Sequence, residues 1–162
     1  MGGYRKIALL TGWLLLESTV SQHFAACQAQ QSSDTEKVAV AIESFNAALS
    51  ARDMDSIERI WAHDAHVIAI SPRDQSFSFG WEAVKSHWED VFAFWSHLRV
   101  LLKEKPRIHI HDGTAWAYSV ANAEGQIRTG QPLAFSTMVT DIFEKRGDMW
   151  LMVSHHASRR QE

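Results

Sequence analysis

Hydrophobic residues recur at helical spacing in three segments of the chain. Residues 35–51 carry four apolar side chains three or four positions apart, namely Val38, Ile42, Phe45 and Leu49. This spacing places them on one face of an amphipathic helix. A short helix should follow and run to about Ala62, because Asp53 or Asp55 can cap its free amides. A third helix should begin at Gly80, and its apolar stripe consists of Trp81, Val84, Trp88, Val91 and Trp95.

The pattern changes to alternating polar and apolar positions in the second half of the chain. Residues 65–70 already favour one strand, and a loop or short edge hairpin should connect it to Gly80. Four further strands are expected after Leu98, and they cover residues 100–111, 114–122, 133–145 and 149–158. Helices that come first and strands that come last predict an α+β domain, in which three N-terminal helices pack on a curved, mostly antiparallel sheet.

The N-terminus has the three-part layout of a secretory signal. Arg5 and Lys6 precede an apolar run over residues 7–16, and small residues then lead to Cys27. The apolar run is about half of the ~20 residues that a membrane-spanning helix needs. A removable signal is therefore favoured over a permanent membrane helix, and a buried N-terminal helix is the alternative.

Removal of the signal should leave one folded domain that is preceded by a short linker. We expect residues 1–27 to be the signal peptide, residues 28–34 a polar linker and residues 35–159 the folded domain. The end of the signal resembles a bacterial lipobox, in which Cys27 would become the lipidated first residue of a membrane-anchored protein. Cleavage near Ala29 would release a soluble protein instead. Both alternatives place the protein outside the cytoplasm, in the bacterial periplasm, either lipid-anchored or soluble.

Composition narrows the classes of function. The 162 residues, 46% of them hydrophobic, fit one globular domain. Sixteen basic residues against nineteen acidic ones give a net charge of −3, so no basic surface is available for nucleic acid. The single cysteine, Cys27, excludes an intramolecular disulfide and a cysteine-based zinc site. The sequence has no glycine-rich phosphate loop, and we expect no cofactor.

Histidines are the residues that could hold a metal. His109 and His111 share one face of a predicted strand, and His155 and His156 come from the same sheet. Together these imidazoles could ligate zinc or copper. Exposed positions beside a hairpin turn account for His109 and His111 equally well, so these two are weak metal candidates.

Several short motifs occur in a particular order along the domain. They are Ala51-Arg52-Asp53, Ile60-Trp61-Ala62-His63-Asp64-Ala65, Gly80 before the Trp-rich helix, Thr114-Ala115-Trp116, Thr140-Asp141-Ile142-Phe143 and Gly147-Asp148-Met149-Trp150. Over roughly residues 35–159 this order resembles the SnoaL-like branch of the nuclear transport factor 2-like superfamily. The resemblance implies a cone-shaped domain, a pocket between helices and sheet, and a homodimer formed through the outer face of the sheet.

The resemblance also implies specific tests for activity, because the fold alone does not decide it. Chemistry of the ketosteroid isomerase type needs a carboxylate base, a tyrosine and a protonated acid. The matching positions hold Ser71, Phe45 and Val139, so that chemistry is rejected. We expect large apolar side chains to form the face through which the sheet pairs with a second copy, namely Ile108, Ile110, Trp116 and Tyr118.

The last predicted strand carries the strongest family pattern, which consists of Trp150, His156 and Ser158. Strict alternation would point these residues, with Met152 and Ser154, to one face, and His155 to the other. We expect that face to line the pocket. His156 could then act as a base or hydrogen-bonding group, or it could simply hold the end of the strand.

The expected function is the binding of a small, largely apolar molecule in this pocket. Asp141 is a second candidate for a catalytic residue beside His156, although a surface strand position also explains it. The other expected ligand-binding residues are Ser158, Ser154, Thr140, Trp61, Trp81, Trp88, Tyr118 and Phe135. A cofactor-independent isomerase, cyclase, hydratase or hydrolase that uses His156 is the alternative function.

Overall fold

The structure, a computed structural model, describes residues 10–161 and divides into two compact units, Met1–Asp34 and Thr35–Glu162. Helix α1 (Leu10–Ala51) begins in the first unit and ends in the second. Its backbone is helical through residues 28–34, where the sequence predicts a linker, because Gln and Ala are good helix formers. The predicted basic pair Arg5-Lys6 lies outside the described residues. No helix in the described part of the chain has the length and apolar character needed to cross a membrane.

Three helices of the second unit follow the predicted hydrophobic spacing. The end of α1 buries Val38, Ile42 and Phe45, each no more than 1% exposed. Helix α2 (Met54–Ile60) is capped by Asp53, whose side chain accepts a hydrogen bond from the amide of Ser56 at 3.1 Å. Helix α3 (Trp81–Phe94) begins after Gly80, whose φ of 79° lies in the left-handed region that favours glycine.

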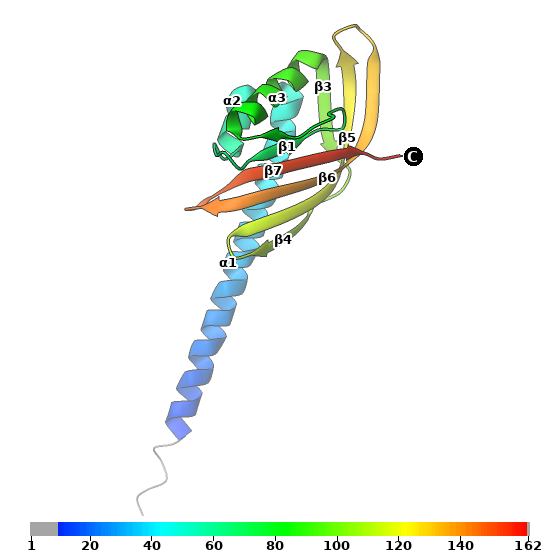
Figure 1. The fold of residues 1–162 in the computed structure, drawn as a ribbon. Coiled ribbons are helices and arrows are strands. Elements are labelled where there is room, and N and C mark those ends of the chain that lie inside the picture. The colour runs from blue at the N-terminus through cyan, green and yellow to red at the C-terminus, as the bar shows by residue number, and fades with distance from the viewer. Residues whose placement is uncertain (1–9, 162) are drawn as a thin grey trace, which may run out of the picture. The chain divides into compact units, whose positions relative to one another are not determined.

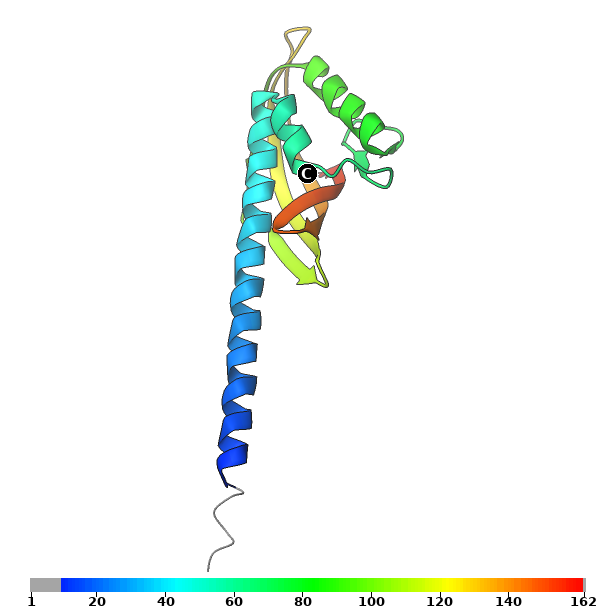
Figure 2. The same cartoon turned by 90° about the vertical axis from the view of Figure 1, so that its left-hand side faces the viewer.

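The strands form one curved, open and mostly antiparallel mixed sheet. They are β1 (Ile68–Ile70), β2 (Ser78–Phe79), β3 (Trp95–Leu102), β4 (Arg107–His111), β5 (Thr114–Ile127), β6 (Pro132–Arg146) and β7 (Met149–Arg159). The order is β2-β1-β7-β6-β5-β3, with β4 also paired to β5; only β1 and β7 run parallel among these neighbours. The long strands β5 and β6 bend between their ends (Figure 1), and Figure 2 shows the second unit from the side.

The strand predicted over residues 100–111 is two strands in the structure. Strand β3 ends at Leu102 and β4 begins at Arg107, and both pair with β5. Pro106 lies in the break, where its missing N–H prevents a continuous ladder. Strand β3 also begins earlier than predicted, at Trp95, so this tryptophan packs into the core from the sheet and not from the helix.

An irregularity in β7 reverses which residues face the core. Ile142 on β6 pairs with Ser154, but the next residue, Phe143, pairs with Met152, so Val153 is the extra residue of a β-bulge. Met152 and Val153 are consequently both buried although they are adjacent in sequence. Beyond the bulge His155 is buried and its neighbour is exposed, the reverse of strict alternation from Trp150.

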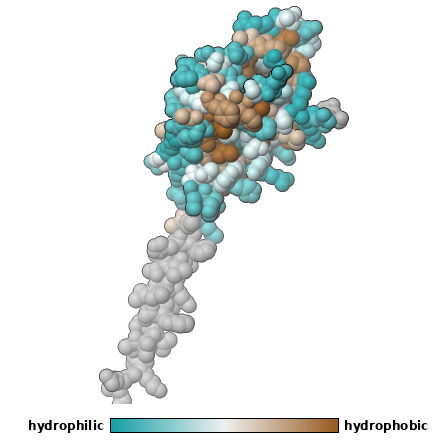
Figure 3. All heavy atoms as spheres, viewed as in Figure 1, coloured by the Kyte–Doolittle hydropathy of each residue, from teal (hydrophilic) through white to brown (hydrophobic). Residues whose placement is uncertain are grey.

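The outer face of the sheet carries exposed apolar side chains. Tyr118 on β5 is 46% exposed and Met138 on β6 is 52% exposed. The prediction that Ile108 and Ile110 share this face is wrong, because both pair with buried alanines of β5 and pack against the core. Trp116 lies two residues before Tyr118 and shares its face. Figure 3 shows hydrophobic residues in the middle of the face that it presents, with hydrophilic residues around them.

Candidate functional site

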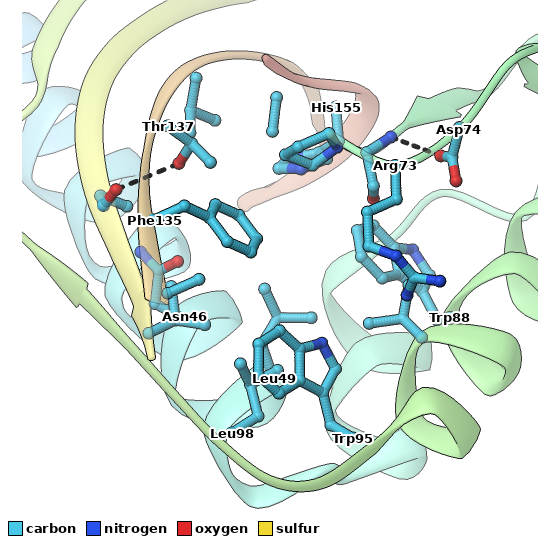
Figure 4. A pocket seen from close by; sticks show the side chains of 18 residues that line it. Asn46, Leu49, Arg73, Asp74, Trp88, Trp95, Leu98, Phe135, Thr137 and His155 are labelled. Atoms are coloured by element: carbon cyan, nitrogen blue, oxygen red, sulfur yellow. Dashed lines mark hydrogen bonds between the residues drawn. The ribbon is translucent and has the colours of Figure 1, made fainter. Parts of the chain in front are cut away.

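A mostly apolar cavity lies between the helices and the inner face of the sheet. The volume of the cavity is about 100 Å³, which is room for several waters or one small organic molecule. Its apolar wall includes Leu49, Trp88, Val91, Trp95, Leu98, Val100, Phe135 and Val139 (Figure 4). Polar groups reach it from Asn46, Ser71, Arg73, Asp74, Thr137 and His155. Such a lining provides apolar area for affinity and a few polar groups for orientation.

A buried histidine and aspartate form the best-defined polar pair at this cavity. His155 on β7 and Asp141 on β6 are direct cross-strand partners, and Nδ1 of His155 lies 2.7 Å from Oδ1 of Asp141. The two side chains are 7% and 3% exposed. His155 lines the cavity, and Asp141 is not among the lining residues, so the carboxylate holds the imidazole from the protein side.

Aromatic rings fix the plane of the His155 imidazole. The ring centroid lies 5.2 Å from that of Phe45 on α1 and 5.3 Å from that of Trp88 on α3. Phe45 and Trp88 also contact each other edge to face, with centroids 5.2 Å apart. Helices α1 and α3 therefore hold the ring that β7 presents, and the imidazole cannot rotate without displacing a buried aromatic side chain.

The pair can perform acid–base chemistry or hold a polar ligand group. A carboxylate at Nδ1 favours the tautomer that carries its proton there and leaves the lone pair on Nε2. Nε2 can then accept a hydrogen bond from a hydroxyl or amide group of a bound molecule. It can equally accept a proton, because the buried Asp141 carboxylate stabilises the resulting imidazolium.

Of the predicted aromatic wall residues, the structure places two at the cavity. Trp88 and Phe135 line it. Trp61 is fully buried in the core beside Phe45, and Trp81 stacks on His63 with ring centroids 4.1 Å apart. Tyr118 was expected in the wall but lies exposed on the outer face of the sheet. Trp81 and Trp88 belong to one predicted helical stripe, but only Trp88 reaches the cavity, because Trp81 lies at the first turn of α3.

The prediction that His156 faces the pocket is wrong. His156 is exposed, and its strand neighbours Thr140 and Ser154 lie outside the cavity lining. Thr140 pairs directly with His156, while Ser158 pairs with the exposed Met138. The four expected polar anchors therefore do come together, but on the face of the sheet opposite to the cavity. The bulge at Val153 is the physical reason, since one extra residue exchanges the two faces of the strand beyond it.

The histidines that the sequence singled out as weak metal candidates are exposed on β4. The nearest acid to His111 is Asp112, with Nε2 and Oδ2 3.3 Å apart, and His109 contacts the ring of Tyr118. Among the side chains that the structure describes, no group of three or more from His, Cys, Asp or Glu is arranged to hold a metal ion. The sequence offers His155 as a possible metal ligand and, by strict alternation, places it on the face away from the pocket; the bulge in β7 reverses that orientation.

Comparisons with known proteins agree with the fold. Residues 38–160 match the SnoaL-like domain family. A nuclear transport factor 2-like superfamily protein from Salmonella enterica superposes with a TM-score of 0.76 at 17% identity, covering 82% of this chain and 94% of that one.

Two further solved structures show the same likeness. A proposed dehydratase of the NTF2-like family from Streptomyces avermitilis gives a TM-score of 0.72 at 19% identity, covering 81% of this chain and 99% of that one. An NTF2-like protein of unknown function from Pseudomonas putida gives 0.69 at 17% identity, with 81% and 89% covered. No curated protein matches the sequence. At these identities the structural likeness shows a common fold.

Proposed function

Because the chain belongs to the SnoaL-like family, we propose that it binds a small, largely apolar molecule in the cavity between helices and sheet. A polar group of that molecule donates a hydrogen bond to Nε2 of His155. The observation that carries this proposal is the buried His155–Asp141 pair, whose imidazole lines a mostly apolar cavity. Buried polar groups nearly always have a hydrogen-bond partner. Nδ1 of His155 has Asp141 as its partner, so Nε2 remains for the ligand.

The size and lining of the cavity define the class of ligand. Trp88, Trp95 and Phe135 offer flat apolar surfaces, which suit an aromatic or alicyclic ring. Thr137 lines the cavity too, but its hydroxyl already donates to the carbonyl of Ala121 at 3.2 Å. Of the polar residues in the lining, His155 is the one whose ring is held by a buried carboxylate, so we expect it to distinguish a ring with a hydroxyl from a plain hydrocarbon ring.

Phenol and benzene are matched probes for this proposal. Calorimetric titration of the purified protein should show that phenol binds more tightly than benzene, since only phenol donates a hydrogen bond to Nε2. Quenching of tryptophan fluorescence should accompany binding, because Trp88 and Trp95 line the cavity. Equal or weaker binding of phenol would contradict a polar anchor at His155.

Proton transfer at His155 is a second candidate function. The specific observation in its favour is the buried carboxylate behind the imidazole, which is the arrangement of a general base and the group that orients it. The base would take a proton from a carbon next to a carbonyl group, as an isomerase or a dehydratase-type lyase requires. Incubation of cyclohexanone with the protein in D₂O tests this directly, because mass spectrometry reports deuterium gained at the α carbons. Exchange no faster than in buffer would remove this candidate.

Export is a further part of the proposal and rests on the sequence. The basic N-terminus, the apolar run and Cys27 favour transport out of the cytoplasm, with either a lipid anchor or a soluble product. Expression of the full chain in a Gram-negative host should yield a mature N-terminus at Cys27 or shortly after it. Radiolabelled palmitate would be incorporated if Cys27 is lipidated. Purification of a chain that retains Met1 from the cytosol would contradict export.

A further inference from the structure

A second polar cluster contacts the same cavity and does not involve His155. Ser71 and Asp74 lie in the loop after β1, and His87 lies on α3. Oγ of Ser71 is 2.8 Å from Nε2 of His87, and Nδ1 of that ring is 3.4 Å from Oδ2 of Asp74. The three side chains therefore follow the order hydroxyl, imidazole and carboxylate, with one ring nitrogen facing each partner.

The loop holds the serine on a tight turn. The amide of Asp74 donates to the carbonyl of Ser71 at 3.0 Å, and the amide of Ser71 donates back to Oδ2 of Asp74 at 2.5 Å. Pro72 occupies the second position of this turn, where its fixed φ is favourable. Asp74 thus both closes the turn and approaches the imidazole, so the loop cannot move the serine without moving the carboxylate.

Burial separates the roles of the three residues. The side chain of His87 is 7% exposed and that of Asp74 is 25% exposed. Ser71 lines the cavity and His87 does not, so of these two residues the serine is the one that a bound molecule can reach. His87 also packs edge to face against Trp88, with ring centroids 4.6 Å apart, which fixes its ring plane.

Burial favours the neutral form of the His87 imidazole, which is the form that a base needs. Burial is the main cause that lowers its pKa, and a nearby charge on His155 would lower it further. Asp74 and Asp90 act in the opposite direction. The imidazole is therefore neutral at pH 7, with a lone pair free to take the serine proton.

We propose that Ser71, His87 and Asp74 form a nucleophilic centre that cleaves a small, apolar carboxylic ester. Oγ of Ser71 forms a bond to the ester carbonyl carbon while its proton moves to Nε2 of His87. The bond from that carbon to the alkoxy oxygen breaks, and the alcohol leaves with the proton from His87. Water then attacks the acyl-serine through the same base, which releases the carboxylic acid and restores the Ser71 hydroxyl.

The cavity supplies the remaining requirements of this reaction. Its apolar wall accepts the acyl or alkyl group, and Arg73 contributes a guanidinium to the lining on the same loop as the serine. The Arg73 guanidinium lies over the ring of Phe94, 3.2 Å from its centroid, and we expect it to turn toward the ester, where a positive charge would stabilise the developing oxyanion. The proposal goes beyond ligand binding at His155, and it is tested by a covalent bond at Ser71, which a phenol titration does not measure.

Phenylmethanesulfonyl fluoride is the probe for the nucleophile. Attack by Ser71 forms a bond to the sulfonyl sulfur, expels fluoride and passes the proton to His87. Intact mass spectrometry should show one phenylmethanesulfonyl group per chain, and peptide mapping should place it on Ser71. Hydrolysis of 4-nitrophenyl acetate by the same protein provides an independent readout of acyl transfer.

Variants decide whether the three residues act together. Ser71→Ala should abolish both labelling and ester hydrolysis, and His87→Gln should slow both by about 100-fold or more, because the glutamine amide cannot act as a base. Ser76→Ala is the matched control, since Ser76 is an exposed serine further along the same loop. Labelling at another serine, or a wild-type protein that neither labels nor hydrolyses the ester faster than Ser71→Ala, would overturn the proposal.

Discussion

The imidazole of His155 and the carboxylate of Asp141 face each other across β7 and β6 with 2.7 Å between Nδ1 and Oδ1. Both side chains are buried, so their interaction is not screened by water. Together with the bulge at Val153, this pairing decides which of the two adjacent histidines reaches the cavity. The proposed binding of a ligand at Nε2 of His155 depends on that choice.

Removal of the carboxylate should destabilise the domain. Asp141→Ala leaves the buried Nδ1 of His155 without its acceptor, and an unmatched buried polar group costs about 1–3 kcal/mol. Urea unfolding followed by circular dichroism measures the change in the free energy of unfolding. Asp148→Ala, at an exposed turn position, is the control and should change it by less than about 0.5 kcal/mol. Equal effects of the two substitutions would show that the pair contributes little.

His87 should make stability depend on pH in a defined direction. Burial is the main cause that holds the pKa of His87 in the folded protein below its ordinary value of about 6.5, so the unfolded chain binds a proton more readily. The free energy of unfolding should therefore decline as the pH falls below about 6.5, and this decline should level off below the folded pKa. Urea unfolding between pH 8 and pH 5 should show a smaller decline for His87→Gln than for the wild type. A steeper decline in the variant would contradict the direction of the shift.

Gly125 should be intolerant of any side chain. It lies on β5 opposite β3, and a Cβ at this position would come within 2.0 Å of the carbonyl oxygen of His97. Gly125→Ala should therefore force the two strands apart and destabilise the fold by about 1–3 kcal/mol. Thermal unfolding checks this, with Glu124→Ala as the neighbouring exposed control. An unchanged melting temperature for Gly125→Ala would contradict the close strand approach.

The outer face of the sheet should mediate a homodimer. Tyr118 and Met138 expose apolar surface there, and an isologous contact would bury the same patch on both copies. Light scattering should report a dimer at micromolar concentration for the wild type. The double substitution Tyr118→Lys and Met138→Lys should give a monomer, because it places like charges at the contact. A wild-type protein that is monomeric throughout this range would contradict the prediction.

Local hydrophobic spacing was sufficient to predict the three helices of the domain and most of the strands. Val38, Ile42, Phe45 and Leu49 are all buried as their periodicity requires, and Asp53 caps the second helix. These features depend on neighbours three or four positions away, so the sequence contains them directly.

The candidate site could not be predicted in the same way, because it depends on distant contacts. The bulge at Val153 coincides with an unusual partner, since the carbonyl of Met152 accepts a hydrogen bond from the amide of Ala62 at 2.9 Å. No periodicity in β7 signals a contact with the segment after α2. The unbroken run of five apolar residues over 149–153 is the local sign that alternation fails there. Ser71 and His87 likewise lie 16 positions apart and meet only through the packing of α3 on β1.

The choice between His155 and His156 is tested most directly by one paired substitution. Asparagine keeps a donor near the position of Nδ1, so His155→Asn can still pair with Asp141, but it lacks Nε2. His156→Asn makes the same change one residue further along, on the exposed side of the strand.

The decisive measurement is the affinity of the two variants for phenol, with benzene as the reference ligand, by calorimetric titration. The account predicts that His155→Asn weakens phenol binding by about 3- to 10-fold, the equivalent of one hydrogen bond, and leaves benzene binding within about twofold. His156→Asn should bind both probes as the wild type does. Weaker phenol binding by His156→Asn, or unchanged binding by His155→Asn, would contradict the assignment of His155 to the site.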